Sequence, residues 1–377
     1  MRVLLDATAI PADRGGVGRY VDAMLPALVA AGVDLAVACQ PRDAARFAEA
    51  VPSAEIAVGP GALARRPARL VWEQVALPRL ARSVSADVLH SPHYTMPRFA
   101  GLPVTVTLHD ATFFTSPELH LAAKARFFRA ATRAAVRRAA SIVVPSAATR
   151  DEVMRVAGGR SDQFFVAHHG VDRAVFHPVD DDERRRVARS LGLDERRYVA
   201  FLGTLEPRKN VPALIRGWVR AVGELADPPA LVLAGARGWD DAVDGAIAEV
   251  PEHLTVLRPG YLPLDDLAGL LAGAQVVAYP SLGEGFGLPV LEAMACGAAV
   301  LTTRLLSLPE VGGDAVSYCE PTAEGVSAGL GALLADESAR DALSGAAVVR
   351  AALFTWDAAA AVHLEAYAAA ISARGAR

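Results

Sequence analysis

Two glutamates that could bind hydroxyl groups lie close together in residues 284–292, whose sequence is EGFGLPVLE. The apolar run before them predicts a buried strand over residues 276–280, and the run after them predicts a helix that Gly297 closes. Glu284 is therefore expected in a loop at the carboxyl end of a strand, and Glu292 near the first turn of the next helix. Free N–H groups at that helix N-terminus form an anion site. If the two acids bind sugar hydroxyls and the helix N-terminus binds an anion, the ligand that suits the site is a sugar joined to a diphosphate.

Two cations, Arg208 and Lys209, occupy a comparable position earlier in the chain. They follow an apolar run, residues 199–202, and precede a helix predicted to begin at Asn210 as its N-cap residue. An Arg can hold a diphosphate with two hydrogen bonds, while a Lys acts as a point charge. A solvated basic pair is the simpler alternative. The turn at Gly203 and the downstream glutamates favour the phosphate site.

Several segments resemble those of the retaining family 4 glycosyltransferases, which have the GT-B fold. Residues 203–210 resemble the family's phosphate-binding stretch, and residues 282–297 match its signature block nearly throughout. Three further segments fall in the expected order, at 15–20 (GGVGRY), 108–110 (LHD) and 169–172 (HGVD). The similarity covers most of the chain and is strongest in the second half.

The resemblance implies a role for each candidate residue of the second half. Arg208 and Lys209 would stabilise the departing nucleoside diphosphate, so that no metal ion is needed. Glu292 would accept hydrogen bonds from the ribose hydroxyls, and Glu284 would contact the transferred sugar; an ordinary first-turn helix acid is the alternative for Glu292. Backbone groups would complete the donor site, at Gly203, Phe286, Gly287 and Leu288.

A glycine-rich segment in the first half offers another contact. Gly15, Gly16 and Gly18 follow the predicted first strand. A dinucleotide-binding fingerprint would need another glycine where the chain has Val21, so that interpretation fails. A flexible loop in which Gly16 approaches the diphosphate from the opposite domain fits better, and a plain loop before a helix is the alternative.

Three histidines of the first half end predicted strands. His109 follows residues 104–108, and the matching histidine of the family contacts the transferred sugar, although a lone histidine is more often a structural hydrogen-bonding group. Asp110 is not expected to orient it, because adjacent strand side chains point in opposite directions. His90 and His93 could line the acceptor side. Together the three could suggest a metal site, but no carboxylate completes the set, so no metal is expected.

Short apolar strands alternate with helical stretches along the 377 residues, a length that suits two domains. This alternation predicts parallel sheets covered on both faces. The expected fold class is α/β, with two Rossmann-like, doubly wound domains facing a central cleft, as in GT-B. Strands are predicted at 2–5, 35–39, 88–90, 104–108, 142–145, 164–167, 199–202, 231–234, 255–257, 276–279 and 299–302.

The predicted domains are an acceptor domain over residues 1–171 and a nucleotide-sugar donor domain over residues 172–355. A last helix, residues 356–377, has Thr355 or Asp357 as its N-cap. By resemblance to the family, this helix packs back on the first domain.

Bulk composition limits the remaining possibilities. Hydrophobic residues make up 53% of the chain and charged residues 21%, as in a globular protein with ample core. No uninterrupted run approaches 18 apolar residues, so no transmembrane helix is expected, and the first residues predict a strand and not a signal peptide. Cys39, Cys296 and Cys319 are odd in number and far apart, which predicts no disulfide framework and a cytoplasmic protein.

Charge is distributed unevenly along the chain. The whole chain has 38 Lys and Arg against 42 Asp and Glu; residues 1–177 hold 21 and 15 of these, a net +6, so the remainder holds 17 and 27, a net −10. A basic helix is predicted over residues 121–139. These features suggest an anionic acceptor or a peripheral contact with the inner face of an anionic membrane, and a solvated basic surface is the alternative.

The resemblance implies a glycosyltransferase that moves a hexose from a nucleotide diphosphate sugar to a glycan or glycolipid, with retention and without a metal ion. Residues 72–75, 90–94 and 110–114 look like bacterial mannosyltransferases, which makes GDP-mannose the expected donor. A nucleotide-sugar epimerase of the same architecture and a non-catalytic nucleotide-sugar-binding partner are the alternatives. No nucleic acid partner is expected, and the acceptor stays open.

Overall fold

The structure, a computed structural model, describes residues 1–12, 14–117 and 121–375. The chain divides into two compact units, one formed by Met1–Gly170 with Thr355–Arg377 and the other by Val171–Phe354. Each unit has its own sheet and its own hydrophobic core. The last two residues of the predicted helix 356–377 lie outside the described residues.

The first unit contains a parallel sheet, with strands in the order β3-β2-β1-β4-β5-β6-β7. The strands are β1 (Arg2–Asp6), β2 (Asp34–Cys39), β3 (Glu55–Val58), β4 (Val88–Ser91), β5 (Val104–Thr107), β6 (Ser141–Val144) and β7 (Phe164–Val166). The helices are α1 (Gly15–Ala30), α2 (Ala44–Ala50), α3 (Arg66–Val75), α4 (Leu77–Ser83), α5 (Thr112–Thr115), α6 (Ala122–Arg138), α7 (Ala147–Ala157) and α16 (Trp356–Gly375).

Alternate side chains of the first unit's strands enter two different cores. Val3 and Leu5 of β1 pack with residues of α1 and α16, whereas Leu4 packs with residues of α4, α6 and α7. This follows from the two-residue period of a strand. Because both faces are covered, the central strands are buried along their whole length, and this includes the polar Thr105 and Thr107 of β5.

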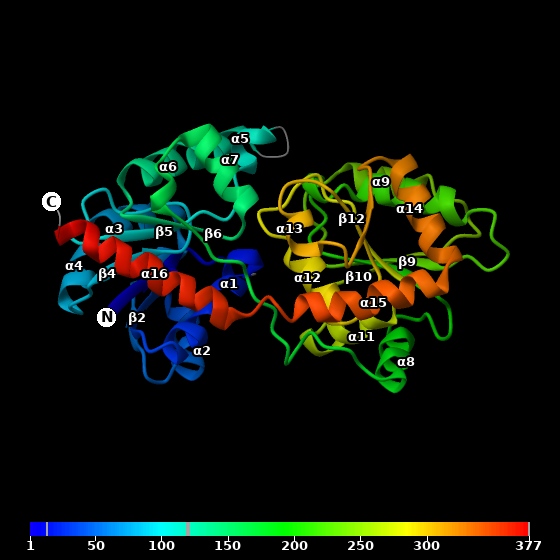
Figure 1. Ribbon diagram of the computed structural model, residues 1–377, viewed down its shortest axis with the longest axis horizontal. Helices are drawn as coiled ribbons and strands as arrows, with labels where there is room; N and C mark the ends of the chain where they lie inside the picture. Colours follow the sequence, from blue (N-terminus) through cyan, green and yellow to red (C-terminus); the bar gives the residue numbers. More distant parts are fainter. Residues whose placement is uncertain (13, 118–120, 376–377) are drawn as a thin grey trace. The chain divides into compact units, whose positions relative to one another are not determined.

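Helix α16, red in Figure 1, packs on α1 and on strands β4 to β7 of the first unit. Thr355 caps it, since the Ala358 N–H donates to Thr355 Oγ1 at 3.1 Å, and this predicted cap is confirmed. Buried polar contacts also hold the helix: His363 Nε2 lies 2.6 Å from the Tyr20 hydroxyl, and the Tyr367 hydroxyl lies 2.8 Å from His90 Nδ1.

The second unit contains a parallel sheet in the order β10-β9-β8-β11-β12-β13. The strands are β8 (Tyr198–Leu202), β9 (Ala230–Ala234), β10 (Val256–Gly260), β11 (Val276–Tyr279), β12 (Val300–Thr303) and β13 (Ser317–Cys319). The helices are α8 (Asp181–Ser190), α9 (Val211–Val222), α10 (Ala242–Ala248), α11 (Leu267–Gly273), α12 (Leu288–Ala295), α13 (Leu308–Gly312), α14 (Ala323–Ala335) and α15 (Glu337–Ala351).

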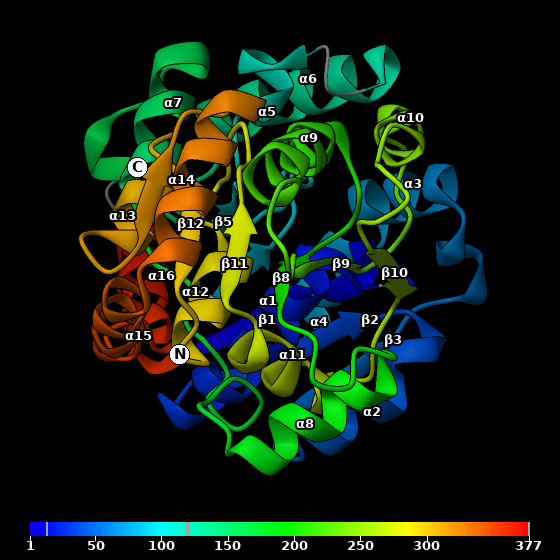
Figure 2. The same cartoon turned by 90° about the vertical axis from the view of Figure 1, so that its right-hand side faces the viewer.

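Helices cover both faces of this second sheet as well. Helices α9 and α14 lie side by side on one face, and α8 packs against α11 on the other (Figure 2). The predicted α/β class with doubly wound parallel sheets is therefore confirmed in each unit. In both sheets the strand order reverses between two neighbours, β1 and β4 in the first unit and β8 and β11 in the second.

Two strands were absent from the sequence-based prediction. Both β3 and β13 lie at a sheet edge. Their side chains are only partly buried, so they lack the continuous apolar run that marks the central strands.

One described stretch, Glu337–Ala373, is long and apolar enough to cross a membrane by length and composition. It comprises α15 and α16, which are separated by residues 352–355 and belong to different units. This criterion rests on length and composition alone, so the expectation that the chain has no transmembrane helix stays a prediction.

Candidate active site

The predicted phosphate-binding cations and the first glutamate meet at one point of the second sheet. Arg208 and Lys209 follow β8, and Glu284 follows β11. These two strands are neighbours at the point where the strand order reverses, so their following loops lie side by side although the residues are 75 positions apart. Ligands of doubly wound sheets bind at such a point, outside the carboxyl ends of the strands.

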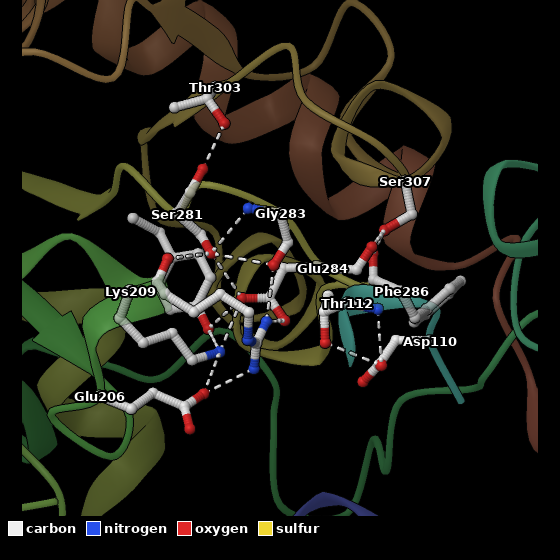
Figure 3. A network of polar contacts seen from close by, with 12 residues as sticks. Asp110, Thr112, Glu206, Lys209, Ser281, Gly283, Glu284, Phe286, Thr303 and Ser307 are labelled. Atoms are coloured by element: carbon white, nitrogen blue, oxygen red, sulfur yellow. Dashed lines mark hydrogen bonds and ion pairs between the residues drawn. The ribbon is translucent and has the colours of Figure 1, made fainter. Parts of the chain in front are cut away.

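Glu284 is the centre of a buried polar network (Figure 3). Its Oε1 accepts hydrogen bonds from Lys209 Nζ at 2.7 Å, from Ser281 Oγ at 2.8 Å and from the Tyr279 hydroxyl at 3.1 Å. Its Oε2 forms an ion pair with Arg208. The structure thus brings together three of the four predicted catalytic residues. It adds Tyr279 and Ser281, for which no role was predicted.

Glu206 is a second carboxylate in this network. Its Oε1 accepts from Arg208 Nη2 at 2.6 Å and lies 3.9 Å from Lys209 Nζ. Two carboxylates therefore face two cations. Glu206 lies within the segment that resembles the family's phosphate-binding stretch, but nothing in its spacing distinguished it from a solvated acid.

Burial and charge act in opposite directions on these groups. Burial alone would raise the pKa of Glu284, but the charges and hydrogen bonds of Arg208 and Lys209 outweigh it and lower the pKa to about 2. Burial and the Arg208 charge lower the pKa of Lys209 from its ordinary value, while Glu284 and Glu206 oppose this. Burial and the Glu284 charge raise the pKa of Tyr279. Tyr279 therefore remains a neutral donor to the Glu284 carboxylate near neutral pH.

Backbone contacts hold the loop that carries Glu284. The Ser307 hydroxyl donates to the carbonyl oxygens of Glu284 and Phe286, each at 2.8 Å, and Arg208 Nη1 donates to the Gly283 carbonyl at 2.7 Å. Gly287 ends the loop with φ of 107°, and a side chain there would lie 3.0 Å from Leu308. Only glycine adopts this conformation readily, so α12 starts sharply at Leu288.

Asn210 is the N-cap residue of α9, as predicted, but its side chain does not cap the helix. The residue has a left-handed conformation, φ 58° and ψ 36°, and makes no capping hydrogen bond. Its side-chain amide instead donates to the Pro280 carbonyl at 3.2 Å and to the Pro321 carbonyl at 3.0 Å. Asparagine tolerates this conformation better than most residues. It therefore ties the turn after β8 to the segments that follow β11 and β13.

Glu292 lies near the first turn of α12, as predicted. It is the fifth residue of α12 and its exposed fraction is 2%. This burial is unusual for an ordinary first-turn helix acid, which was the alternative. Burial and the Glu292 charge raise the pKa of the Cys296 thiol to about 12. The ribose-binding role of Glu292 stays a prediction.

Gly203 lies where two loops approach closely. Its N–H donates to the Ala234 carbonyl at 2.9 Å. A side chain on Gly235, which has φ of 126°, would lie 2.2 Å from the Gly203 carbonyl oxygen. Glycine at position 235 is therefore required for the turns after β8 and β9 to meet, and a donor contact at Gly203 stays a prediction.

The glycine segment of the first unit is helical and not a flexible loop. Helix α1 begins at Gly15, so Gly16 and Gly18 lie in its first turns. Arg14, with φ of 60°, precedes the helix and forms ion pairs with Asp22 and Asp43. The loop interpretation missed this because glycines have low helix propensity, whereas tertiary contacts fix the start of this helix. A diphosphate contact at Gly16 stays a prediction.

His109 follows β5, as predicted, and its Nε2 lies 2.7 Å from the Pro92 carbonyl oxygen. A carbonyl only accepts, so Nε2 carries the proton; burial lowers the pKa of His109, which keeps the ring neutral and leaves Nδ1 as an acceptor. Asp110 accepts from the Thr112 N–H and hydroxyl and does not orient His109.

The two other histidines differ in burial, since His93 is only partly buried. His90 is fully buried between Thr107 and Tyr367, and His93 packs edge-on against Phe128. His90 is therefore structural, which contradicts its suggested place on the acceptor side. Within the part of the chain that the structure describes, no three His, Cys, Asp or Glu side chains gather as metal ligands.

Known proteins match most of this chain. Residues 14–175 match the model of Glycosyltransferase Family 4, and residues 183–349 match that of Glycosyl transferases group 1. The O-antigen chain mannosyltransferase B of Escherichia coli is 32% identical over 72% of this chain and 71% of its own length. The chain belongs to glycosyltransferase family 4. A D-inositol 3-phosphate glycosyltransferase of Mycolicibacterium paratuberculosis is 35% identical to this family 4 chain over 51% of its residues and 44% of the relative.

Solved structures share the fold of this family 4 glycosyltransferase. Sucrose-phosphate synthase from Thermosynechococcus elongatus has a TM-score of 0.77 at 20% identity, covering 98% of both chains. Anabaena HepE in complex with UDP-glucose has a TM-score of 0.74 at 18% identity, covering 97% of this chain and 99% of its own. The lipopolysaccharide glycosyltransferase WaaG has a TM-score of 0.74 at 17% identity, covering 96% and 98%. The fold is GT-B, as predicted.

Proposed function

We propose that this family 4 glycosyltransferase transfers a hexose from a nucleotide diphosphate sugar with retention at the anomeric carbon, and that no metal ion takes part. The observation that carries the proposal is the ion-paired set of Arg208, Lys209 and Glu284 at the carboxyl ends of β8 and β11. Two adjacent cations held at a ligand-binding edge suit a diphosphate.

The cations act on the leaving group. The bond from the anomeric carbon to the β-phosphate oxygen breaks, and the charge of the diphosphate grows as it departs. Arg208 and Lys209 stabilise that charge, and ion pairs with Glu206 and Glu284 keep both cations in place beforehand. The acceptor oxygen attacks the same face of the sugar, and its proton passes to the departing phosphate. The two side chains and the α12 N-terminus supply positive potential without a metal.

The donor we propose is GDP-mannose. Two relatives support the sugar, the O-antigen chain mannosyltransferase B and the serotype-specific mannosyltransferase WbdA of Escherichia coli. The acceptor we propose is a glycan or glycolipid. The net charge of +6 over residues 1–177 supports a peripheral contact with the anionic inner face of a membrane.

A donor screen tests the proposal. The protein is incubated with GDP-mannose, UDP-glucose and other nucleotide sugars and a panel of glycan and lipid acceptors, with released nucleoside diphosphate as the readout. We expect release with GDP-mannose, an α-linked product from its α-linked sugar, and unchanged rates in excess EDTA. Nucleotide release with UDP-glucose alone would overturn GDP-mannose as the donor, and an inverted product would overturn retention. Loss of activity in EDTA that Mg²⁺ or Mn²⁺ restores would overturn metal independence.

A further inference from the structure

The first unit has a cavity of about 590 Å³ at the amino end of strand β5, whereas His109 follows the carboxyl end of that strand. The loop of residues 96–103 lines it together with the end of α6, the segment before β7 and the end of α16. Val104 at the start of β5 is part of the lining, whereas His109 follows the end of that strand. A four-residue strand is roughly 13 Å long, so the cavity is separate from the His109 end of the sheet.

The floor of the cavity is apolar. Buried alanine and valine side chains form it, among them Ala100, Val136, Ala139 and Ala370. Phe99 stands at the rim with an exposed fraction of 85%, the highest among the large exposed hydrophobic side chains of the described residues. A single exposed aromatic ring is common on protein surfaces, but Phe99 adjoins the apolar lining of the cavity.

Arginines surround this apolar floor. Arg98, Arg137 and Arg138 are exposed, and within the described residues no carboxylate forms an ion pair with any of them. Arg138 lies 5.7 Å from the Phe99 ring centroid, and its Nη1 donates to the Arg98 carbonyl at 3.4 Å. Arg160 also lines the cavity but pairs with Asp162. The charge is thus uncompensated at one side of an apolar pocket.

We propose that this cavity binds a single anionic phospholipid, with its phosphate held by Arg98, Arg137 and Arg138 and an acyl chain on the alanine and valine floor. Guanidinium groups match phosphate oxygens with paired hydrogen bonds. The volume lies within the range of small-molecule sites, about 300–1,000 Å³. Phe99 enters the acyl region of the same membrane. The proposal deepens the membrane contact proposed above and is independent of the donor chemistry.

Other arginines of α6 do not share this arrangement. Arg129 Nε donates to the Phe113 carbonyl at 2.6 Å, and the Arg133 guanidinium lies 5.1 Å from the Phe114 ring centroid. Both therefore contact α5, whereas Arg137 and Arg138 line the cavity. The lipid site is assigned to the end of α6 and not to the whole basic helix.

Calorimetry with a short-chain lipid below its micelle concentration tests the site on the full chain. The probes are dihexanoyl phosphatidylglycerol, the zwitterionic dihexanoyl phosphatidylcholine and inorganic phosphate. We expect saturable binding of phosphatidylglycerol only. The double variant Arg98→Gln/Arg138→Gln and the variant Phe99→Ser should each weaken it at least tenfold. The matched control is Arg79→Gln/Arg126→Gln, which removes the same charge from two exposed arginines outside the cavity.

Four outcomes would overturn the proposal: no saturable binding in the unaltered protein, equal weakening in the control, binding of phosphate as tight as that of the lipid, or equal affinity for phosphatidylcholine. All substituted side chains are exposed, so the fold should persist. Binding of GDP by each variant serves as a check and should be unchanged. If the cavity variants still bind vesicles as the unaltered protein does, the membrane contact remains supported and the lipid site in this cavity is rejected.

Discussion

Lys209 keeps a buried ammonium group beside Glu284 and Tyr279, although burial and the Arg208 charge both lower its pKa. Such an arrangement costs solvation free energy and is stable only because carboxylates compensate it. A second cation placed next to the first adds repulsion that a purely structural ion pair would avoid. Glu206 and Glu284 hold Arg208 and Lys209 together in spite of their like charge, as a site for a diphosphate requires.

Removing either cation should lower turnover more than donor affinity. In Arg208→Ala or Lys209→Ala we expect kcat to fall by about 10²-fold or more, the usual scale for a key electrostatic group, because charge on the diphosphate grows as the bond breaks. Steady-state kinetics and calorimetry with GDP separate the two effects. Arg216→Ala is the control, since Arg216 is exposed and pairs with Glu249 on the surface. Near-normal kcat in both site variants would remove these residues from the reaction.

The ion pairs of Glu284 should appear in the pH dependence of stability. Its pKa is about 2 in the folded protein and about 4.3 when unfolded, so its stabilising effect is fully present above pH 4.3 and is lost as the pH falls through 2. Glu284→Gln lacks this effect. We expect the stability difference between the two proteins to be constant from pH 7 to 5 and to shrink below 4.3. Urea unfolding followed by tryptophan fluorescence measures this difference in the free energy of unfolding. A difference that does not change with pH would contradict the stabilising effect of the ion pairs.

Glu292 should act on donor binding. Glu292→Gln keeps the shape of the side chain but removes the charged acceptor for the ribose hydroxyls, so GDP binding should weaken by about 1.5–3 kcal/mol. Glu324→Gln is the control, because Glu324 lies on the surface of α14 and pairs with Arg220. Calorimetry is the measurement. Unchanged affinity in Glu292→Gln would show that the ribose assignment is wrong.

At the scale of elements, the loops after β8, β11 and β13 are linked through Asn210. Its side-chain amide donates hydrogen bonds to the carbonyl oxygens of Pro280 and Pro321, which belong to two segments distant in sequence. Together with the contacts of Ser307 to the Glu284 loop, they make these loops a connected frame and not independent segments. A site built this way is rigid before the donor arrives.

Two substitutions at position 210 should separate the two contributions of Asn210. Asn210→Gly keeps the left-handed conformation and loses two hydrogen bonds, at about 1 kcal/mol each. Asn210→Ala loses the same bonds and adds strain of about 1–2 kcal/mol. We expect Ala to destabilise more than Gly, and urea unfolding measures the order. Equal loss in both variants would show that the backbone conformation contributes nothing.

At the scale of the whole molecule, the chain is basic in its first 177 residues and acidic in the remainder, with net charges of +6 and −10. Surface charges of this size act over about 10 Å at 0.1 M salt. An anionic surface should therefore attract residues 1–177 and repel the remainder of the chain.

Co-sedimentation with vesicles tests this asymmetry. Each Lys or Arg near an anionic surface contributes about 1 kcal/mol. We expect binding that rises with phosphatidylglycerol content, falls from low to high salt and weakens when Arg129, Arg133 and Arg137 are changed to Ser. Phosphatidylcholine vesicles are the control. Protein that stays in the supernatant with anionic vesicles at low salt would favour a soluble acceptor.

The sequence by itself was sufficient to predict features that depend on residues close together along the chain. Continuous apolar runs marked β1, β8 and β11, which are buried on both faces. The turn after β8 with Arg208 and Lys209, and the loop after β11 with Glu284, followed from those strands. The resemblance of the same segments to family 4 led to the family, which the relatives confirm.

Only the tertiary structure decided which of these segments meet. Glu284 pairs with Arg208 and Lys209 because β8 and β11 are neighbours in the folded sheet, which no spacing along the chain specifies. The left-handed conformation of Asn210 and the edge strand β13 likewise depend on partners distant in sequence. Local propensities are worth a few tenths of a kcal/mol to about 1 kcal/mol per residue, so packing and hydrogen bonds to distant segments override them where the two disagree.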